Sequence, residues 1–426
     1  MKKKIIAVIG GGPAGMMAAY TAKKTCGSSA DVVLYERNPM LGKKLRITGK
    51  GRCNVTNNCT PAEFREAVTR NQKFLYGASS RFTAADTMAF FEAWGVPLKT
   101  ERGRRVFPVS DKAADVAAAM EKALTETGVK IHKGMRISGL EVTDDPGGNG
   151  EDYPIRFRCG NTLHGCHALI LATGGVSYPG TGSTGDGHRM LADLEVPVTA
   201  LRPSLVPIET REKTGELMGL TLKNVTLYAY RGEKEVFSEQ GEMLFAHFGL
   251  TGPLVLSASA NMQKGSVTDY RLAIDLKPAL TMEELDKRLL SDFTKYSARD
   301  FCNSLDDLLP RRLIPWVIRV SGIPERCKTA AITRVQRQKL CETLKALPFT
   351  PTKFRPMEEA IITCGGVDTG AVSPKDMMLK KHPGLFCAGE LLDLDAYTGG
   401  YNLQIAFSTG VLAGQGAAAY VTEEQE

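Results

Sequence analysis

The chain has 426 residues, is 43% hydrophobic and 24% charged, and carries a formal net charge of +7. This length suits two or three domains, and this composition excludes a globally disordered chain. The cations gather in short clusters at residues 2–4, 43–52 and 102–105. Because no aromatic residues are interleaved with these clusters along the sequence, we expect solvated faces or small-anion sites and no nucleic-acid partner.

Ten cysteines are scattered through the chain without a C-x-x-C pair or a metal-like His/Cys spacing. This usage predicts free thiols in a reducing compartment and no metal site. The apolar run at residues 5–9 is short for the core of a signal peptide, and no run approaches the roughly 18 apolar residues of a membrane span. We therefore expect a cytoplasmic protein without membrane insertion, and the oligomeric state stays open.

The first elements are predicted within residues 4–37. Residues 4–9 are apolar and β-branched, as in a buried strand, residues 16–25 have the content of a packed helix, and "DVVLYER" follows as a second strand. Between strand and helix, "GGGPAG" satisfies G-x-G-x-x-G, and an acid stands near the end of the second strand. This is the full dinucleotide-binding pattern, in which a pyrophosphate lies on the helix N-terminus and the acid accepts hydrogen bonds from ribose hydroxyls. An acid at this position favours FAD or NAD over NADP. The predicted cofactor residues here are Gly10, Gly12, Pro13, Ala14, Gly15, Glu36 and Arg37.

Residues 38–57, "NPMLGKKLRITGKGRCNVTN", are rich in glycine and cations and almost without apolar residues. They predict an exposed loop, or a long wrap whose amides and cations meet the phosphates and the flavin. Residues 168–187 and 384–410 are also glycine-rich, and each segment follows a strand. NAD needs one such crossing, whereas three crossings spread over both ends of the chain favour an extended FAD. The candidates in these segments are Lys43, Lys44, Arg52, Thr173, Gly174 and Gly389.

The remaining elements follow from periodicity and punctuation. A helix is predicted at 112–127 with strands around residues 130 and 155, and the acidic, glycine-rich stretch 144–152 reads as a hairpin loop. Residues 196–275 alternate as in a small β-barrel or sandwich, and residues 280–348 predict helices with charged faces.

Five motifs carry a resemblance to a known family: "GGGPAGMMAA", "GKKLRITGKGRCNVTN", "ATGGVSYPGTGSTGDG", "LFAHFGLTGP" and "GELLDLDAYTGGYNLQIAFSTG". In these the chain resembles the YhiN/HI0933-like (BaiN-type) FAD-dependent oxidoreductases, also described as aminoacetone oxidase family enzymes. It departs from the family pattern at Ala246, where threonine is common, at Ala396, where glycine is common, and at "PKDMMLKK" before the last strand. These departures concern the substrate face more than the FAD site.

The resemblance implies an α/β fold with a discontinuous Rossmann-like FAD-binding domain, residues 1–195 and 353–426. A β-barrel-like inserted domain would span 196–278 and a helical subdomain 279–352. The resemblance also assigns "GGYNLQ" to the flavin-facing segment, where glycines before a helix direct amides and the positive helix end at the flavin pyrimidine edge. The candidates in this segment are Gly399, Gly400, Tyr401, Asn402, Leu403 and Gln404. Outside it, Glu390 is a candidate for contact with the flavin ribitol or the pyrophosphate, Asn54 and Thr56 are expected near the isoalloxazine ring, and Ile137 is a candidate for backbone contact with adenine.

Candidate acid/base groups are His247, in the inserted domain, and Tyr397. A hydrogen-bonded structural role is the simpler interpretation of a single histidine, and core packing that of the tyrosine. Cys53 has no C-x-x-C partner, which disfavours a dithiol relay.

The sequence has no second G-x-G-x-x-G unit, so NADH or NADPH is expected to bind transiently over the flavin. The leading hypothesis is an NAD(P)H-driven reductase of a C=C bond in an apolar enone, such as a dehydro-bile acid. The alternatives are an oxidase of a small amine such as aminoacetone, and a flavin-containing RNA-associated or regulatory protein.

Overall fold

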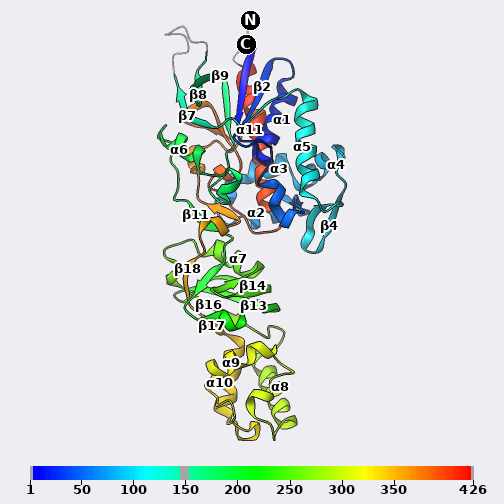
Figure 1. The fold of residues 1–426 in the computed structure, drawn as a ribbon, viewed down its shortest axis with the longest axis vertical. Helices are drawn as coiled ribbons and strands as arrows, with labels where there is room; N and C mark the ends of the chain where they lie inside the picture. The colour runs from blue at the N-terminus through cyan, green and yellow to red at the C-terminus, as the bar shows by residue number, and fades with distance from the viewer. Residues whose placement is uncertain (1–2, 144–152, 424–426) are drawn as a thin grey trace. The chain divides into compact units, whose positions relative to one another are not determined.

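The computed structural model describes residues 3–143 and 153–423, so the hairpin loop predicted at 144–152 lies outside the described residues. The chain forms two compact units. Unit 1 comprises residues 1–203 and 360–426, and unit 2 comprises residues 204–359. Figure 1 shows that both ends of the chain belong to the same unit. No helix among the described residues has the length and apolar character needed to cross a membrane.

Unit 1 is built on a six-stranded sheet in the order β20-β21-β10-β1-β2-β6, parallel except for β20. Its inner strands read as continuous apolar runs because helices and small sheets cover both faces. The bounds are β1 (Lys4–Ile9), β2 (Ala30–Glu36), β6 (Lys130–Lys133), β10 (Ala168–Leu171), β20 (Met378–Leu379) and β21 (His382–Cys387). The predicted parallel α/β sheet is confirmed.

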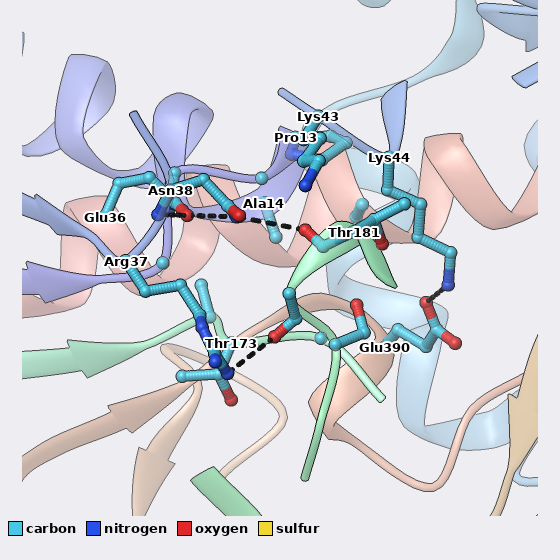
Figure 2. A pocket seen from close by; sticks show the side chains of 18 of the residues that line it. Pro13, Ala14, Glu36, Arg37, Asn38, Lys43, Lys44, Thr173, Thr181 and Glu390 are labelled. Atoms are coloured by element: carbon cyan, nitrogen blue, oxygen red, sulfur yellow. Dashed lines mark hydrogen bonds and ion pairs between the residues drawn. The ribbon is translucent and has the colours of Figure 1, made fainter. Parts of the chain in front are cut away.

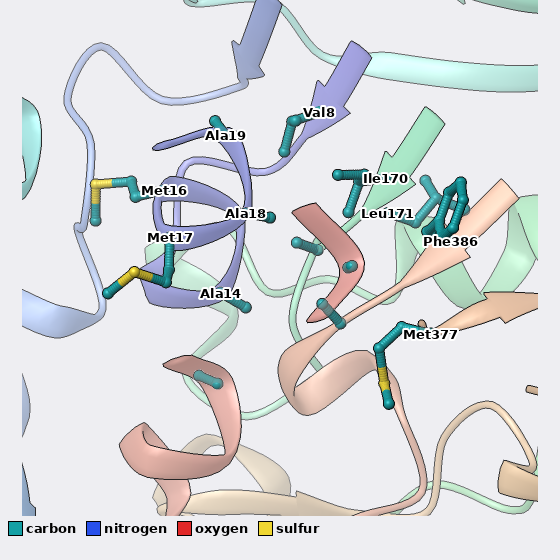
Figure 3. Close-up of a cluster of buried hydrophobic side chains, with 14 of the residues drawn as sticks. Val8, Ala14, Met16, Met17, Ala18, Ala19, Ile170, Leu171, Met377 and Phe386 are labelled. Atoms are coloured by element: carbon teal, nitrogen blue, oxygen red, sulfur yellow. The ribbon is translucent and has the colours of Figure 1, made fainter. Parts of the chain in front are cut away.

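Two helices from opposite ends of the chain pack closely in unit 1, α1 (Pro13–Cys26) and α11 (Tyr401–Glu423). A Cβ added to Gly410 would lie 2.5 Å from the Ala14 carbonyl oxygen, and one added to Gly414 2.5 Å from that of Ala18. Figure 3 shows Ala14 and Ala18 on one side of α1 and the two methionines, Met16 and Met17, on another. Small residues at the contact allow the two backbones to approach each other, so the C-terminal segment completes the N-terminal domain.

Two antiparallel three-stranded sheets and further helices complete unit 1. The first sheet has the order β3-β5-β4 and the second β7-β8-β9. Their strands are β3 (Thr56–Asn57), β4 (Leu98–Glu101), β5 (Arg105–Pro108), β7 (Ile137–Val142), β8 (Ile155–Cys159) and β9 (Thr162–Cys166). The helices are α2 (Pro61–Glu66), α3 (Tyr76–Arg81), α4 (Ala84–Ala93), α5 (Ala113–Thr127) and α6 (Asp186–Ala192); β11 (Arg202–Ser204) and β19 (Ile362–Cys364) are short strands near the unit boundaries.

Unit 2 is a seven-stranded antiparallel sheet in the order β17-β16-β13-β14-β15-β12-β18 with helices packed on it. The terminal strands of this order are separated in the chain only by Thr350, so the sheet must curl until its two ends meet, as in a barrel. The strands are β12 (Ile208–Thr210), β13 (Thr221–Arg231), β14 (Lys234–Ala246), β15 (Gly249–Thr251), β16 (Tyr270–Asp275), β17 (Leu347–Phe349) and β18 (Pro351–Phe354), and the helices are α7 (Pro253–Asn261), α8 (Met282–Lys295), α9 (Ile314–Ser321) and α10 (Arg334–Lys345). The strand-rich and helical segments, which the sequence analysis treats as separate domains, share one hydrophobic core in this unit.

Candidate cofactor site

A cavity opens at the carboxyl ends of the parallel strands of unit 1 (Figure 2). Ligands bind at this edge of open α/β sheets because strand ends and helix N-termini converge there. The cavity walls come from the turn after β1, the loop after β2, the strand β7, the loop after β10 and the segment from β21 to α11. The three glycine-rich crossings predicted from the sequence therefore meet at one cavity.

The three fingerprint glycines have three different surroundings. Gly10 has φ +110°, and a Cβ there would lie 2.4 Å from the Ala172 carbonyl oxygen. A Cβ at Gly15 would lie 1.9 Å from the Gly10 carbonyl oxygen. These two positions need glycine for the fold itself. At Gly12 a Cβ would meet no atom within 4 Å, yet the residue lines the cavity. The free space beside Gly12 is where a pyrophosphate would approach the backbone amides.

Two helix N-termini border this cavity. Helix α1 has Gly12 at its N-cap without a side-chain cap and has no acid in its first turn, so its first amides are available to an anion. Helix α11 contributes Asn402 and Leu403 to the cavity wall and follows Gly399 and Gly400, both at positive φ. A Cβ at Gly400 would lie 2.4 Å from the backbone of Thr56, so glycine is needed there for close packing.

The acid after β2 is held in a fixed orientation. Glu36 is buried, and its carboxylate accepts hydrogen bonds from the Gly11 N–H at 2.7 Å, the Asn38 N–H at 2.7 Å and the Asn38 amide at 2.6 Å. The same Asn38 amide donates to the Thr181 carbonyl at 3.0 Å (Figure 2). The remaining acceptor capacity of Glu36, at the cavity wall, suits ribose hydroxyls.

Beside Glu36, three arginines surround one carboxylate. Asp186 pairs with Arg37 at 3.1 Å, with Arg136 at 3.0 Å and with Arg189. Burial alone would raise the pKa of Asp186, but Arg136, Thr184 and Arg37 hold that pKa below its ordinary value. Arg37, Arg136 and Asp186 line the cavity together with Glu36, so two arginines and two carboxylates lie side by side at this end.

Farther along the cavity, Lys44 and Glu390 form an ion pair that the sequence analysis did not anticipate. The Lys44 ammonium donates to Glu390 Oε2 at 2.6 Å (Figure 2). It also donates to Ser177 Oγ at 2.6 Å. Glu390 Oε1 also accepts from Ser177 Oγ at 2.9 Å and from the Thr363 N–H at 3.0 Å. Lys44, Ser177 and Glu390 follow β2, β10 and β21 in the chain, so only the sheet order brings these three residues together.

The residues present fit FAD. Glu36 suits the adenosine ribose, the α1 N-terminus suits the pyrophosphate, and the α11 N-terminus suits the flavin, all along one cavity. Thr173 adds a buried hydroxyl on the cavity wall that has no hydrogen-bond partner among the described residues. A ligand with polar atoms along its length would satisfy such a group.

Most of the predicted cofactor residues line the cavity, and some do not. Those that do are Gly10, Gly12, Pro13, Ala14, Glu36, Arg37, Lys43, Lys44, Ile137, Thr173, Gly174, Glu390, Asn402 and Leu403. Those outside its wall are Gly15, Arg52, Asn54, Thr56, Gly389, Gly400 and Tyr401. Wall residues that were not named individually include Gly11, Asn38, Thr48, Arg136, Thr181, Gly182, Ser183, Asp186 and Ile362. Several of these lie inside the glycine-rich segments already singled out, which is the signal that could have identified them.

Two of the residues outside the cavity wall have clear structural partners. Arg52 pairs with Glu101 at 2.5 Å and with Asp111 at 2.6 Å, and stacks over Phe107. Thr56 donates to Gln404 Oε1 at 2.6 Å and thereby ties the loop after β2 to α11. Both side chains act in shaping the loop that borders the cavity.

The two acid/base candidates lie in different units. Tyr397 lies in unit 1, in the loop before α11, where its N–H donates to the Ala67 carbonyl at 3.0 Å. It is not part of the cavity wall. His247 lies in unit 2, exposed between β14 and β15, with its ring edge-to-face against Phe248. A catalytic role for either residue stays a prediction.

The buried His188, beside Leu391, is expected to make the stability of the fold depend on pH. Its Nε2 lies 3.1 Å from the Leu391 carbonyl, and burial lowers its pKa from the ordinary 6.5. Because the unfolded chain binds the proton more tightly, unfolding becomes more favourable as the pH falls below about 6.5. We expect His188→Gln to reduce the loss of Tm between about pH 7.5 and 5.5, measured by thermal unfolding. The exposed His247→Gln is the matched control, and equal pH dependence of all three proteins would contradict the assignment.

Comparison with known proteins places this geometry in a family. The model of the HI0933-like protein Rossmann domain matches residues 4–416. The 3-dehydro-bile acid delta(4,6)-reductase of Clostridium scindens is 28% identical over 97% of this chain and 98% of its own. The ribosomal RNA dihydrouridine synthase of Haemophilus influenzae is 30% identical over 94% of this chain and 95% of its own. The Escherichia coli protein of the same name is 29% identical over 94% and 95%.

Among the solved structures, one at a TM-score of 0.50 supports the fold alone. The 3-ketosteroid delta1-dehydrogenase of Sterolibacterium denitrificans aligns with 98% of this chain and 100% of its own, at 12% identity and a TM-score of 0.50. A 3-ketosteroid-delta4-(5alpha)-dehydrogenase of Rhodococcus jostii RHA1 aligns with 98% and 97%, at 15% identity and a TM-score of 0.49. Given the family model over nearly the whole chain and the cavity at its sheet edge, the chain belongs to the HI0933-like family and is an oxidoreductase of the FAD type.

Proposed function

We propose that the protein is an FAD-dependent reductase that uses NADH or NADPH to saturate a C=C bond conjugated with a carbonyl group. The observation that carries this proposal is the cavity whose residues fit FAD. Two relatives of the chain are named for the reduction of such a C=C bond or for its product.

The names of the relatives share one chemistry although their substrates differ. A 3-dehydro-bile acid with delta(4,6) unsaturation has C=C bonds conjugated with its 3-ketone, and dihydrouridine is uridine whose C5=C6 bond, conjugated with the C4 carbonyl, is saturated. Saturating such a bond adds a hydride to one carbon and a proton to its neighbour, and in this protein we propose NADH or NADPH as the hydride source. The relatives therefore have the reaction class in common, whereas they differ in substrate.

When bound, FAD would supply hydride transfer from NAD(P)H to the C=C carbon farther from the carbonyl. This chain's residues would hold the cofactor: Glu36 would orient the ribose, and the amides of α1 would bind the pyrophosphate. The N-terminus of α11 stabilises negative charge beside Asn402 and Leu403. Apolar side chains at Leu403, Ile361 and Ile362 line the same cavity.

Two substrates fit this class. A steroid dienone is the apolar enone expected from the sequence, and it matches the substrate for which one relative is named. A uracil base in RNA is the second candidate, because two relatives are named for that product in ribosomal RNA.

An anaerobic titration tests the reaction class. The purified yellow protein should be bleached by NADH or NADPH and should regain its colour with a 4,6-dien-3-one steroid or with uridine-containing RNA. If neither nicotinamide bleaches it, the proposal fails. Release of peroxide from aminoacetone in air without nicotinamide would instead identify the small-amine oxidase.

A further inference from the structure

The positive charge of the chain is concentrated in two short segments of unit 1. Residues 43–60 and 99–112 together hold ten lysines and arginines and two carboxylates. Their balance of +8 exceeds the +7 of the whole chain. The remainder of the protein is therefore close to neutral.

The fold joins these segments beside the cofactor cavity. Both contribute strands to the β3-β5-β4 sheet. The buried Asn57 amide donates to the Gly103 carbonyl at 3.0 Å and to the Gly399 carbonyl at 3.1 Å. One side chain thus ties the tip of the β4–β5 hairpin to the loop that begins α11. Lys43, Lys44 and Thr48 of the first segment are themselves in the cavity wall.

Both carboxylates of these segments already have cationic partners. Glu101 is held by Arg52 at 2.5 Å, and Asp111 by Lys99 at 2.7 Å and Arg52 at 2.6 Å. The hydrogen bond from Arg52 lowers the pKa of Glu101, and those from Lys99 and then Arg52 lower that of Asp111. Both acids are therefore ionised and committed near neutral pH, and they do not neutralise the exposed tip.

The exposed tip keeps its cations available to solvent. Lys50, Arg102 and Arg105 are exposed, and no carboxylate within the described part of the chain pairs with them. Arg104 is exposed too and pairs with Glu63 at 2.7 Å. We call the set Lys50, Arg102 and Arg105 the basic rim.

A half-buried aromatic ring lies next to the same hairpin. A Cβ at Gly399 would be 3.0 Å from Tyr401 Cε2, and the Gly399 carbonyl shares the Asn57 amide with the Gly103 carbonyl of the hairpin. Cations beside an aromatic ring are the combination that binds single-stranded nucleic acid, through phosphates and base stacking. The sequence does not show this combination because residue 401 is far from residues 99–112 in the chain.

We propose that the basic rim binds the phosphodiester backbone of single-stranded RNA and so presents a base to the cofactor cavity. The inference rests on the proposed function and selects, of its two substrates, the uracil carried on RNA. It also replaces the expectation, drawn from the sequence, that the protein has no nucleic-acid partner. Arg102 and Arg105 belong to the β4–β5 hairpin and Lys50 to residues 45–51, where a Cβ at Gly49 would lie 3.5 Å from Phe107 of that hairpin. Exposed cations on adjacent segments suit contact with phosphates.

The test is RNA binding by the FAD-loaded protein, followed by fluorescence anisotropy. The probe is a fluorescein-labelled, uridine-rich single strand of about 12 nucleotides. We expect a dissociation constant of about micromolar or tighter in about 0.1 M salt, weakening steeply as salt rises. The triple variant Lys50→Gln, Arg102→Gln, Arg105→Gln should bind about tenfold more weakly, with a salt slope shallower by about two.

A matched variant removes the same charge elsewhere. Lys287, Arg326 and Arg334 are exposed cations of unit 2, and Lys287→Gln, Arg326→Gln, Arg334→Gln should change affinity less than about twofold. FAD absorbance and far-ultraviolet circular dichroism check that each variant is folded. The single variants Arg102→Gln and Arg105→Gln should each show part of the loss.

Three results would overturn the inference: no RNA binding, equal loss in the two triple variants, or binding to phosphatidylglycerol vesicles without binding to RNA. Bleaching by NAD(P)H followed by reoxidation with the steroid dienone alone would leave the reaction class intact and remove this substrate. RNA binding by a protein that NAD(P)H does not bleach would support the RNA surface and contradict the proposed reductase activity.

Discussion

A Gly12→Val variant is expected to fold as the parent protein does and to lose FAD. Gly12 has φ −79° and ψ 179°, which any residue adopts, and a Cβ there would meet no protein atom within 4 Å. The added isopropyl group would occupy the space that the pyrophosphate needs beside the α1 amides. We expect FAD affinity to fall at least about 100-fold, roughly 3 kcal/mol, by titration of the apoprotein.

The matched control is Gly15→Ala, three residues along the same turn. Its Cβ would lie 1.9 Å from the Gly10 carbonyl oxygen, so α1 could not pack against the end of β1. We expect this smaller change to destabilise the apoprotein itself, with a lowered Tm. If Gly12→Val purified yellow with parental affinity, the cavity would not be the FAD site.

An Arg70→Met variant is expected to lose about 3–5 kcal/mol of stability, because it leaves two buried carboxylates without their cation. Arg70 pairs with Asp393 at 2.9 Å and with Asp395, which is fully buried, at 3.1 Å. The same loop is tied down by the Asn71 amide, which donates to the Asp393 carbonyl at 2.8 Å. Urea unfolding measures the lost free energy, and thermal unfolding should show a lower Tm. Since this loop leads into α11, FAD affinity should fall as well.

The matched control for Arg70 is a surface pair of the same unit. Lys130 pairs with Asp31 at 2.7 Å, but its side chain is 61% exposed, so Lys130→Met should change stability by less than about 1 kcal/mol. Equal losses of stability in Arg70→Met and Lys130→Met would show that the ion pairs of Arg70 contribute no more than a surface ion pair.

The cofactor-binding half of the site could be predicted because its chemistry is local in sequence. One turn of glycines between β1 and α1, and an acid at the end of β2, set the backbone geometry and the hydrogen-bond acceptor within one βαβ unit. The later segments could be assigned because glycine-rich loops after parallel strands meet at one sheet edge. The contacts of individual side chains within those segments were harder to predict. Lys43 and Lys44 are adjacent, and only the crossing of the loops decides that Lys44 pairs with Glu390.

The sequence therefore predicts the kind of domain, the nucleotide class and the glycine positions expected to contact the nucleotide, because steric rules for glycine and the periodicity of strands act over a few residues. The tertiary structure alone decided the partners: Lys44 with Glu390, Arg52 with Glu101 and Asp111, and Asn57 between the β4–β5 hairpin and α11. Charged and amide groups can pair with any suitable group, so their choice is made by the strand order and loop crossings that bring distant segments together.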